Sequence, residues 1–381
     1  MNARIIGIDI TRAFAILLVT WKHSMASFGA RGVLDGWAHY SLEILMQLAT
    51  PVFLILFGAM LELVYRPRFE RGLATETARR LYKRSLQCYG YYALAIVVFF
   101  TLMGTYSAMS LPLVFTGFIS VPFSHLLAFY TAALALAPLL ILARIRFGLG
   151  VLIGGALLVH LAHPLFLQLP PAPELFGRDY LQHMSGFLYG KGVNFIGPSL
   201  IHGLSLVCFG MLFGSGLKPT QKADGKFRMS PRISLLMATV CMSILALCFN
   251  WQAPLESLDR LVGAELRMSS HPLYFSIGIL GAIIMTWGFI LLNDIFKLGV
   301  GRSLQVFGRR SLFAFGIGNI LAYIAPIAWV DIFGLWGSVL LLFSIVCGLT
   351  LIYDHVEKQE LLKRHYARFR SLGRRLRSAV F

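Results

Sequence analysis

Three side chains near the start of the chain have types and a spacing suited to anion binding and acid–base chemistry. Asp9, Arg12 and His23 lie in one apolar stretch, DITRAFAILLVTWKH. On an α-helix, residues three apart share a face, so Asp9 and Arg12 are expected to pair. Eleven residues separate Arg12 from His23, which returns them to within roughly 20° of one face, about 16 Å apart along the axis. The pattern predicts a stripe of polar groups that lines one cavity at different depths.

The composition explains why these groups are informative. The chain has 381 residues, of which 57% are hydrophobic and 13% are charged, whereas a soluble domain carries about 25% charged residues. Charged groups at membrane depth usually face a bundle interior or a wet cavity and mark a functional path. The alternative is an interfacial salt bridge and an interfacial histidine. The same Arg-x10-His spacing recurs at Arg260 and His271 in a polar loop, so the spacing alone is not specific.

The elements that must position these residues are apolar helices. Runs of about 20 apolar residues are long enough to span a bilayer, and period-two alternation typical of barrel strands is absent. We therefore predict an all-α, polytopic transmembrane helix bundle over 1–355, followed by a basic cytoplasmic tail over 356–381. The ten predicted spans are 7–28, 42–65, 85–104, 123–143, 147–167, 197–216, 233–252, 272–296, 310–329 and 332–354.

The distribution of positive charge predicts the orientation. Most of the 34 Lys and Arg residues fall at the N-terminus, in alternate loops and in the tail, which by the positive-inside rule places both termini in the cytoplasm. The net charge of +17 is then explained by topology and by attraction to anionic membrane lipids, so nucleic acid is not an expected partner. No cluster of His, Cys and carboxylate residues has ligand spacing, so no metal is expected.

Several further segments accompany the Asp-x2-Arg-x10-His pattern: FLILFGAM (53–60), RRLYKRSLQCYGYY (79–92), SHLLAFYTAALALAPLLI (124–141) and GRRSLFAFGIGNIL (308–321). Together they resemble the acyltransferase-3 superfamily of membrane acyltransferases. The order of RGLATETARRLYKRSLQCY, PSLIHGLSLVCFGMLFG and GRRSLFAFGIGN is most similar to its OpgC-type branch, which is associated with succinylation of periplasmic glucans. Two departures stand out. Phe57-Gly58 replaces the family's Ser-Gly, and the late segment lacks the aromatic-His ending of other branches.

The resemblance implies an enzyme, an O-acyltransferase of the bacterial inner (cytoplasmic) membrane. Its donor would be acyl-CoA, either succinyl-CoA or acetyl-CoA, and its acceptor a hydroxyl of a periplasmic or cell-envelope glycan. The catalytic residues would be His23, Arg12 and Asp9. His23 would act as a base or acyl carrier, Arg12 would bind an oxyanion, and Asp9 would orient Arg12.

The same resemblance suggests binding residues. Arg80 and Arg84 match the family's basic pair at the third helix and, with Arg66 and Arg68, are predicted to bind the phosphates of acyl-CoA; contact with lipid headgroups is the alternative. Four residues are candidates for binding the acceptor: His125, His202, Trp37 and Tyr180. Helix–helix hydrogen bonds and the interfacial aromatic belt predict the same residue types.

A transporter is the competing interpretation. Asp9, Arg12 and His23 would then form an intramembrane polar path for a glycan or small solute, without chemistry. Use of an acyl donor discriminates between the two. The sequence does not specify the acyl group, the acceptor or the oligomeric state.

Overall fold

The computed structural model describes residues 5–103, 121–175, 177, 179–190, 197, 199–217, 220–221, 227–228, 230–263 and 265–359. Regular structure in these ranges is helical, apart from one antiparallel pair of two-residue strands, Thr220–Gln221 (β1) and Phe227–Arg228 (β2). The all-α class predicted from the sequence is confirmed for this part of the chain.

The first half of the chain contains the helices that surround the candidate site. In order they are α1 (Ile6–Ser27), the 3₁₀ turn η1 (Ala30–Gly32), α2 (Gly36–Gln47), α3 (Ala49–Met60), the π-helical turn η2 (Leu61–Tyr65), α4 (Arg66–Glu70), α5 (Ala74–Met103), α7 (His125–Gln168) and α8 (Tyr180–Tyr189). From α2 to α4 the helical path is nearly continuous, so the predicted span 42–65 lies inside a longer element, Gly36–Glu70.

The second half supplies the remaining walls of the bundle. These elements are α9 (Leu200–Gly216), α10 (Arg232–Cys248), α11 (Pro254–Val262), α12 (Glu265–Met268), α13 (Pro272–Ile290), the π-helical turn η3 (Leu291–Ile295), the 3₁₀ turn η4 (Arg302–Leu304), α14 (Gln305–Arg309), α15 (Ser311–Ile324) and α16 (Trp329–Lys358). The last helix ends three residues beyond the predicted boundary at 355, and residues 360–381 of the predicted tail lie outside the described residues.

Five helical segments among the described residues are long and apolar enough to cross a membrane: Gly36–Glu70, Ala74–Leu102, His125–Gln168, Pro272–Ile295 and Trp329–Lys358. Three shorter apolar helices, α9, α10 and α15, have 14 to 17 residues. The apolar helices indicate a membrane protein. Each of the ten predicted spans overlaps a helix among the described residues, whereas ten crossings and the cytoplasmic side of the termini stay predictions.

The boundary between two predicted spans is a sharp kink. The spans expected at 123–143 and 147–167 correspond to two helices within α7 that meet at Gly148, whose backbone is not helical (φ 82°, ψ 174°). Side chains other than glycine rarely adopt this left-handed φ. A glycine at this position therefore lets the chain change direction between the two helices without a longer loop.

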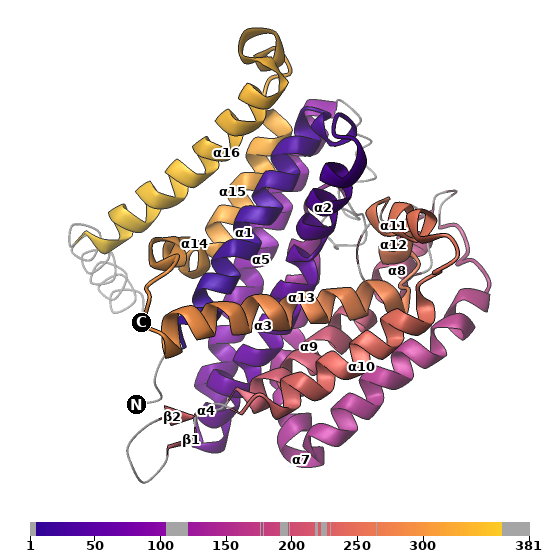
Figure 1. Cartoon of the computed structure of the whole chain (residues 1–381), viewed down its shortest axis with the longest axis vertical. Helices are drawn as coiled ribbons and strands as arrows, with labels where there is room; N and C mark the ends of the chain where they lie inside the picture. Colours follow the sequence, from indigo (N-terminus) through magenta and orange to yellow (C-terminus); the bar gives the residue numbers. More distant parts are fainter. Residues whose placement is uncertain are drawn as a thin grey trace, which may run out of the picture.

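The helices pack in two directions (Figure 1). Figure 1 shows α1, α5 and α15 running roughly alongside one another, while α13 crosses in front of α3, and α10 lies beside α13. The long helix α16 stands at the edge and exposes large apolar side chains, among them Ile332 (69% exposed) and Ile352 (60%). An unpartnered apolar face of this length suits contact with lipid.

The contact between α3 and α9 depends on glycine. A Cβ at Gly58 would lie 2.0 Å from the carbonyl oxygen of Val207, and a Cβ at Gly210 would lie 2.2 Å from that of Ile55. The two backbones are therefore in direct contact, as is common where small residues face each other in membrane helices. Gly58 belongs to the Phe57-Gly58 pair, so this glycine has a packing role in the wall of the bundle.

Candidate active site

Helix α1 is held in place at its N-terminus by a carboxylate from another element. Asp294 of η3 accepts hydrogen bonds from the backbone N–H groups of Ile6 (2.9 Å) and Gly7 (2.8 Å). The first N–H groups of a helix have no partner within the helix, and a negative charge at this end is stabilising. Asp294 thus fixes the position of the helix that carries Asp9, Arg12 and His23.

Arg12 faces a cavity of about 230 Å³, somewhat below the roughly 300–1,000 Å³ of typical ligand pockets. The cavity is also lined by Arg84 of α5, and its remaining wall is mostly apolar, with Phe53, Phe57 and Leu126 among its members. Arg12 is half-buried and Arg84 is exposed. A cavity with an apolar wall and two guanidinium groups fits a ligand with an apolar part and an anionic part.

Neither guanidinium is paired with another described residue. Among the described residues, the ion pairs and hydrogen bonds include none made by the side chain of Arg12 or Arg84. In this part of the chain no ion pair joins Asp9 to Arg12, and Asp9 has interactions of its own. The two arginines keep their charge available for a ligand.

His23 is oriented by a buried amide. The side chain of Asn319 on α15 is fully buried, and its Nδ2 donates to the backbone carbonyl of Phe123 at 2.9 Å. This bond turns Oδ1 toward His23, whose Nδ1 lies 2.9 Å away. Because an amide oxygen only accepts, Nδ1 of His23 carries the proton and Nε2 is left as the acceptor. The imidazole is thus fixed in the tautomer that a general base requires.

One aromatic residue connects the histidine to the cavity. Phe315 lines the cavity, and its ring centroid lies 5.8 Å from that of His23. Phe123 packs on the same imidazole at 4.6 Å. His23 is therefore directly behind the cavity wall, at the end remote from Arg12 along α1.

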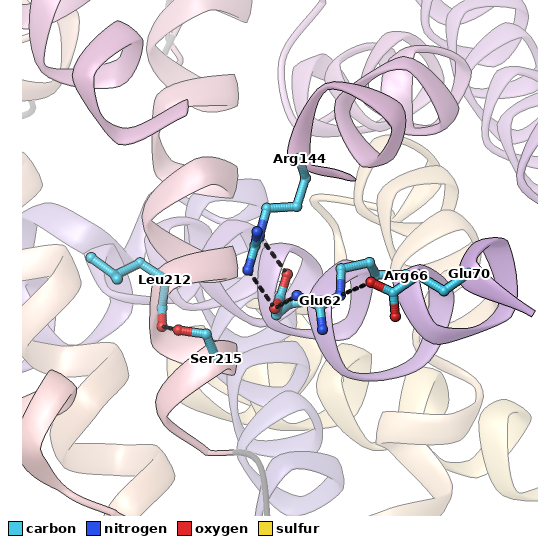
Figure 2. A network of polar contacts seen from close by, with 6 residues as sticks. All are labelled: Glu62, Arg66, Glu70, Arg144, Leu212 and Ser215. Carbon is cyan, nitrogen blue, oxygen red and sulfur yellow. Dashed lines mark hydrogen bonds and ion pairs between the residues drawn. The ribbon is translucent and has the colours of Figure 1, made fainter. Parts of the chain in front are cut away.

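A buried carboxylate fixes one part of the cavity wall (Figure 2). Glu62 of η2 is fully buried and binds Arg66 at 2.6 Å. Figure 2 shows Arg144 of α7 approaching the same carboxylate from the opposite side, with nitrogen–oxygen distances of 3.1 and 3.2 Å. The π-turn that carries Glu62 lies between Met60 and Tyr65, which both line the cavity. The ion pairs thus fix an irregular turn, and π-turns are frequent at functional sites.

The remaining arginines predicted to bind acyl-CoA lie apart from Arg84. Arg66 is occupied by Glu62 and, at 3.2 Å, by Glu70. Arg80 is exposed and paired with Glu76 one turn away. Arg68 is half-buried on α4, beside neither cavity described here. Of the four arginines, the structure brings only Arg84 together with Arg12, and the binding roles of the others stay predictions.

A second cavity of about 450 Å³ adjoins the first. Arg84 and Leu312 line both cavities, and Arg309 and Arg310 at the start of α15 line the second. Arg310 also lies over the ring of Tyr353, at 5.6 Å from its centroid. Both arginines belong to the GRRSL segment, which the sequence had singled out as a family motif. The cavity beside them forms where α5, α15 and α16 meet.

The candidates for binding the acceptor are dispersed. His125 starts α7 and is close enough to His23 for their charges to interact. His202 belongs to a separate group with His160 and His163, with ring centroids 5.2 and 4.5 Å from its own. Trp37 is 71% exposed on α2. Tyr180 begins α8, and its side chain lies outside the described residues.

Each histidine in this group uses one ring nitrogen in a hydrogen bond. His160 bonds to the hydroxyl of Ser205 at 2.8 Å, and His163 donates to the carbonyl of Ser269 at 2.9 Å. His202 bonds to the hydroxyl of Ser199 at 2.7 Å. In the described part of the chain, no group of three or more His, Cys, Asp or Glu residues is arranged to hold a metal ion.

Comparison with known proteins gives one match. Residues 4–125 match the family described as OpgC protein, and this stretch, about a third of the chain, contains Arg12, His23 and Arg84. The match supports an OpgC-like family. No curated protein and no solved structure matches the chain.

Proposed function

We propose that the chain is a membrane O-acyltransferase that transfers an acyl group, succinyl in the first instance, from acyl-CoA to a hydroxyl of a cell-envelope glycan in the bacterial inner membrane. The observation that carries the proposal is the cavity shared by Arg12 and Arg84, with the oriented His23 behind its wall. All three residues fall in the stretch that matches OpgC.

The donor would occupy the two adjoining cavities. Its phosphates would bind Arg84, because guanidinium groups form paired hydrogen bonds to phosphate oxygens. Arg309 and Arg310 also line the second cavity, but both are paired with Asp354. Its uncharged arm would lie along Phe53 and Phe57. Arg12, about 16 Å from His23 along α1, would bind a second phosphate oxygen of the donor.

The transfer itself needs one proton acceptor. As the acceptor hydroxyl oxygen bonds to the thioester carbon, Nε2 of His23 takes the hydroxyl proton. The carbon–sulfur bond then breaks, and the leaving thiolate takes the proton from Nε2 of the His23 imidazolium, which restores the neutral base. The products are the glycan ester and free CoA. Asn319 acts as a positioning residue, because its bond to Nδ1 keeps Nε2 free to accept.

The test is acyl transfer by the purified full-length protein in lipid nanodiscs, with radiolabelled succinyl-CoA or acetyl-CoA and a glucan acceptor. We expect labelled glucan from the wild type, none from His23→Ala, and wild-type yield from His355→Ala, which removes an exposed histidine on α16. Arg12→Lys should lose most activity, since lysine cannot form paired hydrogen bonds. If folded wild-type protein in liposomes transports glucan across the bilayer without labelling it, the proposal is overturned and the transporter is favoured.

A further inference from the structure

Close to His23 lies a group of four charged residues, three of them positive and one negative. The group consists of Lys22, Arg31, Glu43 and Arg267 and is called the Glu43 cluster below. Glu43 is 2% exposed and receives two hydrogen bonds from Arg31, both at 2.6 Å. Lys22, 12% exposed, lies 3.8 Å from the same carboxylate. One carboxylate thus faces three cationic side chains.

Arg267 is the member without a partner. It projects from α12, close enough to Arg31 and Glu43 for their charges to act on it. Its side chain makes no ion pair or hydrogen bond with any described residue, and its Nε is fully buried without a partner. Burial lowers the pKa of Arg267 from its usual value. Burying an uncompensated charge is costly, so we expect Arg267 to have a function that offsets this cost.

Other buried polar groups next to Arg267 also lack partners. The Nδ1 of His125 and the hydroxyl of Tyr274 are both buried and make no hydrogen bond. Arg267 is close enough to each for an electrostatic interaction. Each buried polar group left unsatisfied costs about 1–3 kcal/mol. Two hydrogen-bonding groups of this kind beside an unpaired guanidinium are what a site for anionic oxygens contains when the anion is removed.

The unpartnered groups lie beside the candidate base. His23, His125 and Arg267 are each half-buried. Arg267 and Lys22 each act electrostatically on His23, so the Glu43 cluster lies close to the candidate base.

We propose that the Glu43 cluster, with Arg267 as its main ligand, binds an anionic oxygen group, carboxylate or phosphate, of a substrate that reacts at His23. The inference rests on the proposed function for the identity of that substrate. The group could belong to the acyl chain, as the free carboxylate of a dicarboxylic acyl group, or to the glycan, as an anionic substituent.

Binding is tested without catalysis. The midpoint of thermal unfolding of the full-length protein in nanodiscs is measured with succinate, with inorganic phosphate and with uncharged succinamide. We expect at least one anion to raise the midpoint of the wild type and of Arg260→Gln, and neither to raise that of Arg267→Gln. Arg260 is the matched control because it lies on the neighbouring α11, exposed and paired with Glu265. No stabilisation of the wild type, or equal stabilisation of Arg267→Gln, overturns the site.

Activity then identifies the source of the anion. Succinyl-CoA is compared with butyryl-CoA, and a neutral glucan with a phosphate-substituted one. Arg267→Gln should lose roughly tenfold or more in kcat/KM for the charged member of one pair and little for the uncharged member. Equal loss for both members of each pair would make Arg267 a structural residue and overturn the proposal. A wild type that transfers neither acyl group refutes the proposed function, while the unfolding measurements still decide whether the anion site exists.

Discussion

Replacing Asn319 by leucine should disturb the orientation of the base, His23, without changing the binding of the acyl donor. The substitution keeps the size and removes both hydrogen bonds of the buried amide, to His23 and to the carbonyl of Phe123. Two buried groups then lose their partner, at about 1–3 kcal/mol each. The free energy of unfolding should therefore fall by roughly 2–6 kcal/mol, and the assay temperature must lie below the lowered midpoint.

The kinetic effect should appear in kcat. General-base catalysis contributes about 10²–10⁴-fold, and Asn319→Leu lets the imidazole of His23 sample both tautomers and other orientations. We expect kcat for acyl transfer to fall by roughly 10²-fold or more, with the KM for acyl-CoA nearly unchanged. The cavity that contains Arg12 and Arg84 does not include Asn319. Asn319→Asp keeps an acceptor for Nδ1–H and should retain intermediate activity.

Asn293 provides the matched control for this experiment. It is also fully buried, and its Nδ2 donates to the carbonyl of Phe289 at 3.1 Å, in η3 and away from His23. Asn293→Leu should lower stability and leave kcat close to that of the wild type. The reasoning fails if folded Asn319→Leu retains the wild-type kcat, or if Asn293→Leu loses kcat to the same extent.

Two further predictions concern arginines that each have a nearby arginine as a control. Arg84→Gln should raise the KM for acyl-CoA roughly tenfold through loss of a charged hydrogen bond. Arg80→Gln, which lies outside both cavities, should leave that KM unchanged. Equal KM values for the two variants in steady-state assays would contradict the role of Arg84 in donor binding. Arg144→Gln removes two hydrogen bonds from the buried Glu62 and should cost about 1.5–3 kcal/mol, read as a lower unfolding midpoint. Arg146→Gln, exposed beside it, should have little effect, and equal midpoints for the two variants would contradict the role of the ion pair.

The helices could be predicted from the sequence because apolar runs report burial or lipid contact directly. Their ends and directions could not. The boundary between 123–143 and 147–167 was expected at 144–146, whereas the chain leaves helical geometry at Gly148. Likewise α15 has 14 residues where 310–329 was expected, since the chain leaves the helix at Ala325 in an extended conformation.

The site was predictable only where its residues share one helix. Arg12 and His23 could be related through helical geometry because α1 is continuous. Asn319 is 296 residues from His23, and Arg267 reaches the Glu43 cluster from a four-residue helix. Such contacts depend on how helices pack, which a single sequence does not specify. Asp9 and Arg12 show the same limit, because helical spacing permits a contact without requiring it.

The distance between Arg12 and His23 bears on the choice between an acyltransferase and a transporter. Eleven helical positions place them about 16 Å apart along α1, and the cavity that contains Arg12 is lined mostly by apolar residues such as Ile16 and Phe57. A path for protons or a polar solute needs polar groups along its length, and this wall provides few. A donor with phosphates at one end, a reactive carbonyl at the other and a long uncharged arm between them would suit this arrangement. In the proposed acyltransferase the base lies far from the arginine because each would bind a different end of one extended molecule.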